Sequence, residues 1–61
     1  MTTKDFHRTV PWGRADEAAA ELVARARRDG YTVYLGEQHD QVSAGRVRVT
    51  VTMGRADQWA A

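Results

Sequence analysis

The 61-residue sequence contains no cysteine, only two histidines, one proline and one lysine, and no isoleucine. No disulfide can therefore hold the fold together, and no cluster of residues with metal-ligand spacing takes its place. Large apolar side chains are scarce as well, with two tryptophans, two tyrosines and one phenylalanine. A chain of this length is close to the lower limit for folding alone, and small scaffolds without such cross-links usually depend on a partner chain. We expect one small domain, residues 1–61, that forms a homo-oligomer.

Long hydrophobic runs are also missing, so the sequence predicts neither a membrane span nor a signal peptide. The net charge is +1, which indicates no class of partner. Eight arginines against one lysine are typical of a GC-rich genome. We expect a cytoplasmic protein from a bacterium or a phage, with polar ends that fray at residues 1–5 and 60–61.

The clearest helix signal extends from Gly13 to Gly30. This stretch is rich in alanine, and its apolar positions recur at helical spacing. Acidic residues occupy the first turns and arginines the last, as the helix dipole favours. Gly30 is suited to the left-handed position that ends a helix. The apolar stripe that we expect to pack consists of Ala15, Ala19, Leu22, Val23 and Ala26.

Three segments have the pattern of β-strands. Arg46 to Met53 alternates valine or methionine with arginine or threonine over eight residues. Tyr31 to Leu35 is rich in β formers, and we expect Val33 and Leu35 to face the helix and Tyr34 to face away. Phe6 to Trp12 alternates loosely, with Arg8 interrupting its apolar row. Pro11 predicts that this strand is short or has an open edge, because proline donates no ladder hydrogen bond.

The remaining internal segment, Gly36 to Gly45, is polar. The sequence is compatible with a long hairpin loop here, or with strand extensions around a turn near His39 and Asp40. We expect the part from Glu37 to Ala44 to be dispensable for folding.

A repeat links the two ends of the chain. Thr50 to Ala61 matches Thr9 to Ala20 at an offset of 41, with eight of twelve positions identical. Chance similarity between alanine- and arginine-rich stretches is one interpretation. The other is that Gly54 starts a second, short helix, which Trp59 would anchor.

The predicted element order is strand, helix, strand, strand, short helix. It indicates an α+β fold, a small ferredoxin-like βαββ(α) unit with one helix on a three-stranded antiparallel sheet. In this arrangement the first and third strands are neighbours, and the missing fourth strand leaves the first one exposed along an edge. Exposed edges pair readily with another chain, which again favours a dimer.

An alanine-rich helix, Asp-Gly-Tyr-Thr-Val-Tyr-Leu, a polar loop and Gly-Arg-Val-Arg-Val together resemble the sporulation-related repeat (SPOR) domains. The resemblance covers Val10 to about Asp57. It implies a βαββαβ ferredoxin-like fold that binds peptidoglycan glycan strands lacking stem peptides. The chain departs from the family at the first strand, which reads Thr-Val-Pro-Trp-Gly, and it lacks the final strand and any export segment.

Catalysis has little support in the sequence, and we expect no enzyme and no cofactor. His39 stands between Glu37 and Asp40, a trio that suggests a metal or an acid–base pair, but a solvated loop histidine is the more common case. The chain has no thiol nucleophile and no glycine-rich phosphate loop. Gly13 and Gly54 each precede Arg-Ala-Asp and are suited to helix capping.

Two sets of residues remain as candidates for binding. The first is the sheet face turned away from the helix, which is a nucleic-acid surface, a subunit interface or an ordinary solvated face. We expect it to carry His7, Thr9, Thr32, Tyr34, Arg46, Arg48 and Thr50. The second is a basic patch of Arg25, Arg27 and Arg28, which either contacts phosphate or complements the helix dipole.

These observations predict a small, non-catalytic interaction or regulatory protein, dimeric, with a protein or nucleic-acid partner. A nucleic-acid-binding module that uses the open sheet face is one alternative. A SPOR-like glycan-binding domain is the other.

Overall fold

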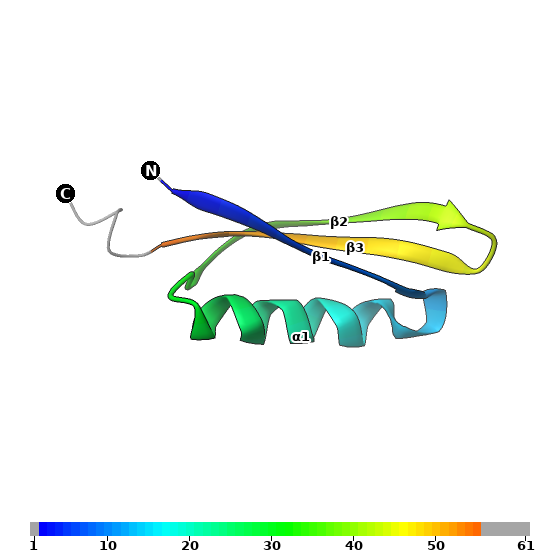
Figure 1. Ribbon diagram of the computed structural model, residues 1–61, viewed down its shortest axis with the longest axis horizontal. Coiled ribbons are helices and arrows are strands. Elements are labelled where there is room, and N and C mark those ends of the chain that lie inside the picture. The colour runs from blue at the N-terminus through cyan, green and yellow to red at the C-terminus, as the bar shows by residue number, and fades with distance from the viewer. Residues whose placement is uncertain (1, 56–61) are drawn as a thin grey trace.

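A computed structural model describes residues 2–55 of the chain (Figure 1). Its elements follow in the order β1 (Thr3–Pro11), the 3-10 helix η1 (Trp12–Arg14), α1 (Ala15–Arg28), β2 (Val33–Ser43) and β3 (Arg46–Gly54). The strands form one sheet, and α1 lies along one face of it (Figure 1). The predicted α+β class, with one helix and a three-stranded antiparallel sheet, is confirmed.

The last strand of the described chain lies at the centre of the sheet, in the strand order β1-β3-β2. Both neighbours pair antiparallel with β3, so β1 and β2 run parallel to each other on either side of it. The predicted proximity of the first and third strands is therefore correct. Each of β1 and β2 has a second side that pairs with no strand in residues 2–55.

The helix ends where the sequence predicts. Gly30 has φ 91°, the left-handed conformation that glycine adopts without strain. The N–H of Gly30 donates to the carbonyl of Arg27 at 3.1 Å, and the N–H of Tyr31 donates to Ala26 at 2.9 Å. These two bonds define a Schellman motif, which satisfies carbonyl groups at the helix end. At the other end α1 begins at Ala15, because Gly13 and Arg14 belong to the 3-10 turn.

The core is a layer of small side chains from α1 against larger ones from β1 and β3. From the helix it contains Ala15, Ala18, Ala19, Leu22 and Ala26, which is the predicted stripe with Ala18 added and Val23 only partly buried. From β3 it takes every second residue, all fully buried: Val47, Val49, Val51 and Met53. Phe6 and Val10 of β1 complete it, and Tyr31 packs edge-on against Phe6 with 5.7 Å between ring centroids.

Of the two alternatives for Gly36 to Gly45, the structure has the strand extension, but with the turn after Ser43 rather than near His39 and Asp40. β2 extends through this segment to Ser43, and only Ala44 and Gly45 form the turn into β3. Gly45 has φ 75°, which a side chain would strain. The prediction that Glu37 to Ala44 is dispensable thereby loses its premise, because most of these residues pair with β3.

The ends of β1 also differ from the prediction. The strand begins at Thr3, so residues 3–5 are paired rather than frayed. Trp12 lies in η1 and is 46% exposed, so it does not continue the buried row of Phe6 and Val10. The predicted second helix after Gly54, with Trp59, falls beyond the residues that the structure describes.

Leu22 is the only large side chain that α1 contributes fully to the core, at 4% exposed. We expect Leu22→Ala to lower the free energy of unfolding by about 2–5 kcal/mol, because a cavity replaces most of the side chain. Urea unfolding followed by circular dichroism measures this loss. Ala24→Ser, an exposed change on the same helix, is the control and should have a small effect. Equal stability of the two variants would contradict the packing of this face.

Candidate binding surface

The sheet face opposite α1 collects five of the seven residues predicted for it. Residues directly opposite each other in a sheet point to the same side, and β3 alternates buried positions with Arg46, Arg48, Thr50 and Thr52. The register pairs Thr9 with Arg48, His7 with Thr50, and Pro11 with Arg46. This outer face thus unites five predicted residues from two strands, His7, Thr9, Arg46, Arg48 and Thr50.

Tyr34 and Thr32 do not belong to the outer face. Tyr34 pairs with the buried Met53, so it lies on the side of the sheet that faces α1. The physical reason is a β-bulge at Leu35, which inserts one extra residue and reverses the alternation on either side of it. Thr32 precedes β2 and is part of no strand.

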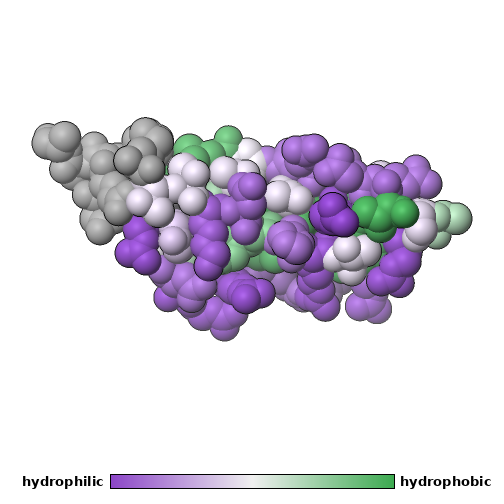
Figure 2. All heavy atoms as spheres, turned by 45° about the horizontal axis from the view of Figure 1, so that its top comes forward, coloured by the Kyte–Doolittle hydropathy of each residue, from purple (hydrophilic) through white to green (hydrophobic). Residues whose placement is uncertain are grey.

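The outer face is polar and has no aromatic ring other than the imidazole of His7. Its Arg46 and Arg48 side chains are exposed and make no hydrogen bond or ion pair with the described part of the chain. Thr52 donates a hydrogen bond of 2.7 Å to Asp5, and Gln38 donates one of 3.1 Å to Asp40. Figure 2 shows a surface on which hydrophilic residues predominate. Without tyrosine or tryptophan, this face offers no stacking platform for bases.

The free edge of β1 presents regularly spaced backbone groups. The backbone N–H of Trp12 donates to the carbonyl of Gly45, and the backbone N–H of Arg55 donates to the carbonyl of Thr2. Each bond joins two directly opposite residues, one pair at each end of the β1–β3 pairing. Since bonded pairs alternate along an antiparallel ladder, the even positions of β1 bond to β3. The N–H and C=O groups of Thr3, Asp5, His7 and Thr9 therefore point away from the sheet. Pro11 falls on the same side, where its missing N–H leaves no gap in the ladder.

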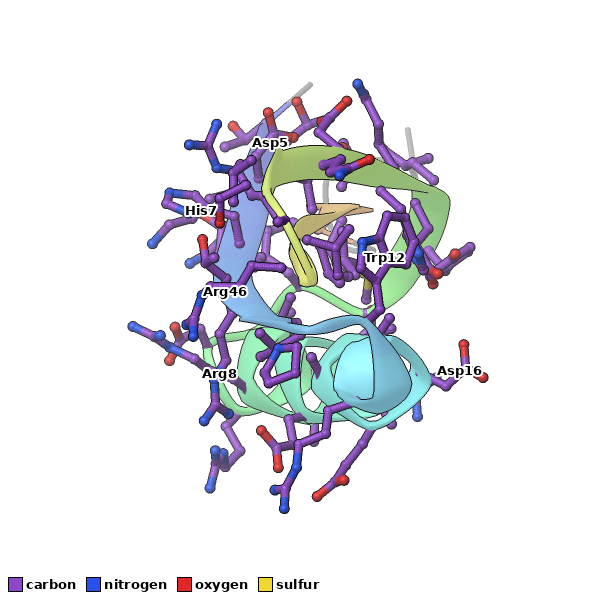
Figure 3. All side chains as sticks on the ribbon, turned by 90° about the vertical axis from the view of Figure 1, so that its right-hand side faces the viewer. Asp5, His7, Arg8, Trp12, Asp16 and Arg46 are labelled. Carbon is purple, nitrogen blue, oxygen red and sulfur yellow. The ribbon has the colours of Figure 1, made fainter. Side chains whose placement is uncertain are left out.

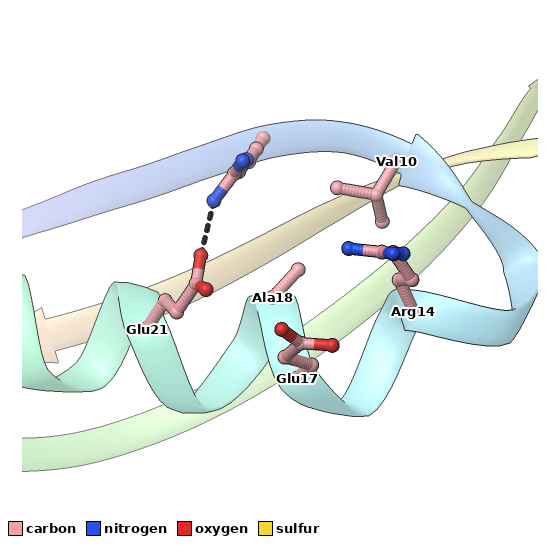
Figure 4. Close-up of a pocket in the computed structure, with 6 residues that line it drawn as sticks. Val10, Arg14, Glu17, Ala18 and Glu21 are labelled. Carbon is pink, nitrogen blue, oxygen red and sulfur yellow. Dashed lines mark hydrogen bonds and ion pairs between the residues drawn. The ribbon is translucent and has the colours of Figure 1, made fainter.

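A groove runs between this free edge and α1. Its first hollow is lined by Arg8, Val10, Arg14, Glu17, Ala18 and Glu21 (Figure 4). Arg8 projects toward the helix and forms an ion pair with Glu21 (Figures 3 and 4). Arg8, which interrupts the apolar row of β1, thus links the strand to the helix through this ion pair.

The groove becomes basic toward the C-terminal end of α1. A second hollow, of about 310 Å³, is lined by His7, Arg8, Glu21, Leu22, Arg25 and Arg28. A third, at the start of β1, adds Lys4, Asp5 and Phe6 to His7 and Arg25. Lys4 lies on the inner side, with its Nζ 5.2 Å from the Phe6 ring centroid. Of the predicted basic patch, Arg25 and Arg28 thus face the groove, and Arg27 lines none of these hollows.

The groove was not predicted from the sequence, although its open edge was. Pro11 predicted a short strand or an open edge near its end, and the missing fourth strand predicted that the first strand is exposed along one edge.

Within residues 2–55, β2 carries most of the exposed large hydrophobic side chains. Four large hydrophobic side chains are exposed by 42–51%, and three of them, Tyr34, Leu35 and Val42, belong to β2. The fourth is Trp12, whose side chain lies on the β2 side of the domain, away from His7 and Arg8 (Figure 3). We call this exposed set the β2 patch; Tyr34 and Leu35 lie near the start of β2, and Val42 and Trp12 lie near its far end, so the set extends along the strand.

His39, Glu37 and Tyr34 form a small polar cluster beside that patch. The phenol of Tyr34 donates to Glu37 at 3.1 Å, and Glu37 contacts the His39 ring. Partial desolvation raises the pKa of Tyr34, and the hydrogen bond to Glu37 and the charge of that carboxylate act in the same direction. Asp40 is not part of the cluster, since it lies on the other face, opposite Arg48. Among residues 2–55, no three histidine, aspartate, glutamate or cysteine side chains are grouped to hold a metal ion.

Comparison with known proteins assigns no family: no family model, no curated protein and no solved structure matches the chain. Within the described residues, α1 falls short of the length and hydrophobicity that a membrane-crossing helix needs.

The outer face should tolerate substitution. We expect Arg46→Ser combined with Arg48→Ser to change the free energy of unfolding by less than about 1 kcal/mol, because both side chains are exposed and unpaired. Denaturant unfolding measures the change. Val49→Ser, on the buried side of the same strand, is the matched control and should lose more than about 2 kcal/mol. A large loss in the double variant would mean that this face is covered in the folded protein.

Proposed function

We propose that this chain is a small, non-catalytic interaction protein of the cytoplasm that binds a protein partner and works as a homodimer. The observation that carries the proposal is the one-sided cover of the sheet: α1 occupies part of one face, and no element of residues 2–55 covers the outer face or pairs with the second edge of β1 or β2. We also assign the fold to the ferredoxin-like class, since the order β1-β3-β2 is that of its first three strands.

The β2 patch supports the dimer. Exposed large apolar side chains along one strand offer surface that another chain can bury. The bulges at Leu35 and Val42 interrupt the ladder of β2, which disfavours edge-to-edge pairing there. We therefore expect the second copy to cover the side chains of Tyr34, Leu35, Val42 and Trp12 rather than to extend the sheet.

A protein partner is favoured over nucleic acid by the chemistry of the outer face. Arg46 and Arg48 are suited to phosphate contacts, which keeps nucleic-acid binding as the second candidate. However, Tyr34 lies on the opposite side of the sheet, so the stacking that a single strand requires has no platform here. A binding affinity for single-stranded DNA that falls steeply with salt would favour this second candidate. Glycan binding of the SPOR type has no observation of its own in the structure.

The solution mass tests the dimer. Light scattering after size-exclusion chromatography should give twice the 6.8 kDa of the chain. Leu35→Ser combined with Val42→Ser should shift the protein toward the monomer, because it removes apolar area from the β2 patch.

The Arg46→Ser and Arg48→Ser variant is the control, and it should remain dimeric. A natural chain that is monomeric at every concentration would contradict the homodimer. A double β2 variant that stays dimeric would place the interface elsewhere.

A further inference from the structure

We propose that the groove between β1 and α1 binds an acidic, extended peptide segment of the protein partner, which adds to the sheet as a strand beside β1. The inference rests on the proposed function and specifies its binding site and the chemistry of its partner. Three independent features carry it: the edge, the groove and the charge.

The edge is suited to strand addition. β1 pairs with β3 without a bulge over nine residues, whereas β2 carries two bulges. Its outward N–H and C=O groups recur at every second residue, about 6.6–6.8 Å apart, which is the spacing that a further strand requires. Proteins protect free edges with bulges, prolines, charged side chains or covering loops. On β1 such protection comes from Pro11, at the end of the strand, and from the charged side chains of Lys4, Asp5 and Arg8. The pairing of β1 with β3 has no bulge, so its outward backbone groups stay in regular register for a strand of suitable charge.

The groove gives the added strand a place for its side chains. A neighbouring strand lies about 4.8 Å from β1, and every second side chain would point to the α1 side of the sheet. That side holds the hollows floored by Phe6, Val10, Ala18 and Leu22. Peptide recognition by strand addition combines both elements, since main-chain bonds give affinity and pockets for alternate side chains give specificity.

The charge of the groove selects an acidic occupant. The half of the groove near the C-terminal end of α1 is lined by Arg25, Arg28 and Lys4. None of these three side chains makes an ion pair within residues 2–55. Of the acids that line the second and third hollows, Glu21 pairs with Arg8, and Asp5 lies on the outer side of the sheet, where it accepts a hydrogen bond from Thr52. A glutamate or aspartate at every second position of the added strand would meet these cations.

A second copy of the chain is a less suitable occupant of the same edge. Antiparallel self-pairing of β1 over its whole length would set the cationic end of one groove beside the first hollow of the other, where Arg8 and Arg14 offset Glu17 and Glu21 and no net negative charge is available. The β2 patch also offers that copy a more apolar surface. The dimer and the peptide site thus use opposite sides of the domain.

The test uses the full chain labelled with ¹⁵N and a capped nine-residue peptide in which glutamate alternates with threonine. Backbone amide shifts in titrations should change along β1 and on the groove side of α1, and binding should weaken as salt rises. A peptide with lysine in place of glutamate should not bind. A peptide N-methylated at the positions that bond to β1 should bind far more weakly, because methylation removes the ladder donors.

Paired variants locate the charge. Arg25→Ser combined with Arg28→Ser should weaken peptide binding by about fivefold to tenfold, because two exposed ion pairs are lost. Arg27→Ser, on the same helical turn but outside the hollows, should change it less than about twofold. Thr9→Pro removes an outward N–H without removing a bond to β3, and it should weaken binding as methylation of the peptide does.

The outcomes are distinct. Failure of the acidic peptide to bind, or equal binding of the lysine peptide, would overturn the proposal. Binding that N-methylation leaves unchanged would show charge attraction without strand addition and would also overturn it. A dimer whose contact is β1 itself would place the second copy in the groove and exclude the peptide. If the peptide fails to bind in these ways but the protein still has a dimeric mass that the β2 double variant lowers, the peptide site is refuted and the proposed dimer still stands.

Discussion

The constraint that governs this domain is that one helix must cover a sheet of three strands. A helix with its side chains is about 10–12 Å across, and strands are spaced about 4.8 Å apart, so α1 has the width of about two strands. Because its packing face is mostly alanine, α1 approaches the sheet closely and buries the inner side chains of β3 and β1. β2 is left largely uncovered. The exposed Tyr34, Leu35 and Val42 follow from this, and so does the polar cluster of Glu37 and His39 on an inner face.

The same constraint explains which parts of the fold could be predicted from the sequence. β3 is covered on one face along its whole length, so it shows strict alternation and its limits were predicted nearly correctly. The helix was also predictable, because its sequence has an apolar stripe at helical spacing and a stop signal, Gly30, at its end. β2 has no covered face beyond its first residues, so nothing selects apolar residues at its inner positions, and Glu37 to Gln41 has the composition of a loop. The bulge at Leu35 then reversed the predicted side for Tyr34.

The candidate site was predictable to the same extent. Arg46, Arg48 and Thr50 were placed correctly because they alternate with buried valines, and His7 and Thr9 because they flank Phe6 and Val10. The groove beside β1 was missed, since it depends on where α1 lies relative to the strand edge, and periodicity along the chain carries no such information. Arg8 illustrates this limit. In the sequence it interrupts an apolar row, and in the structure it reaches the helix to pair with Glu21.

The two sides of the domain therefore differ in kind. On the β2 side, uncovered apolar side chains surround a bulged strand, which suits an interface between copies. On the β1 side, a regular free edge runs beside a basic groove, which suits an extended acidic segment. Because the two surfaces are separate, the proposed self-association and the proposed partner binding would not compete, and both would depend on the position of α1.

The central claim is that β1 is a free edge in the folded protein. Amide hydrogen exchange at single-residue resolution tests it most directly, because protection reports whether each N–H is bonded. Phe6, Arg8 and Val10 should exchange slowly, since their N–H groups bond to β3, while Asp5, His7 and Thr9 should exchange fast. Slow exchange at all six positions in the absence of a peptide would show that another strand already covers β1, and it would contradict this account.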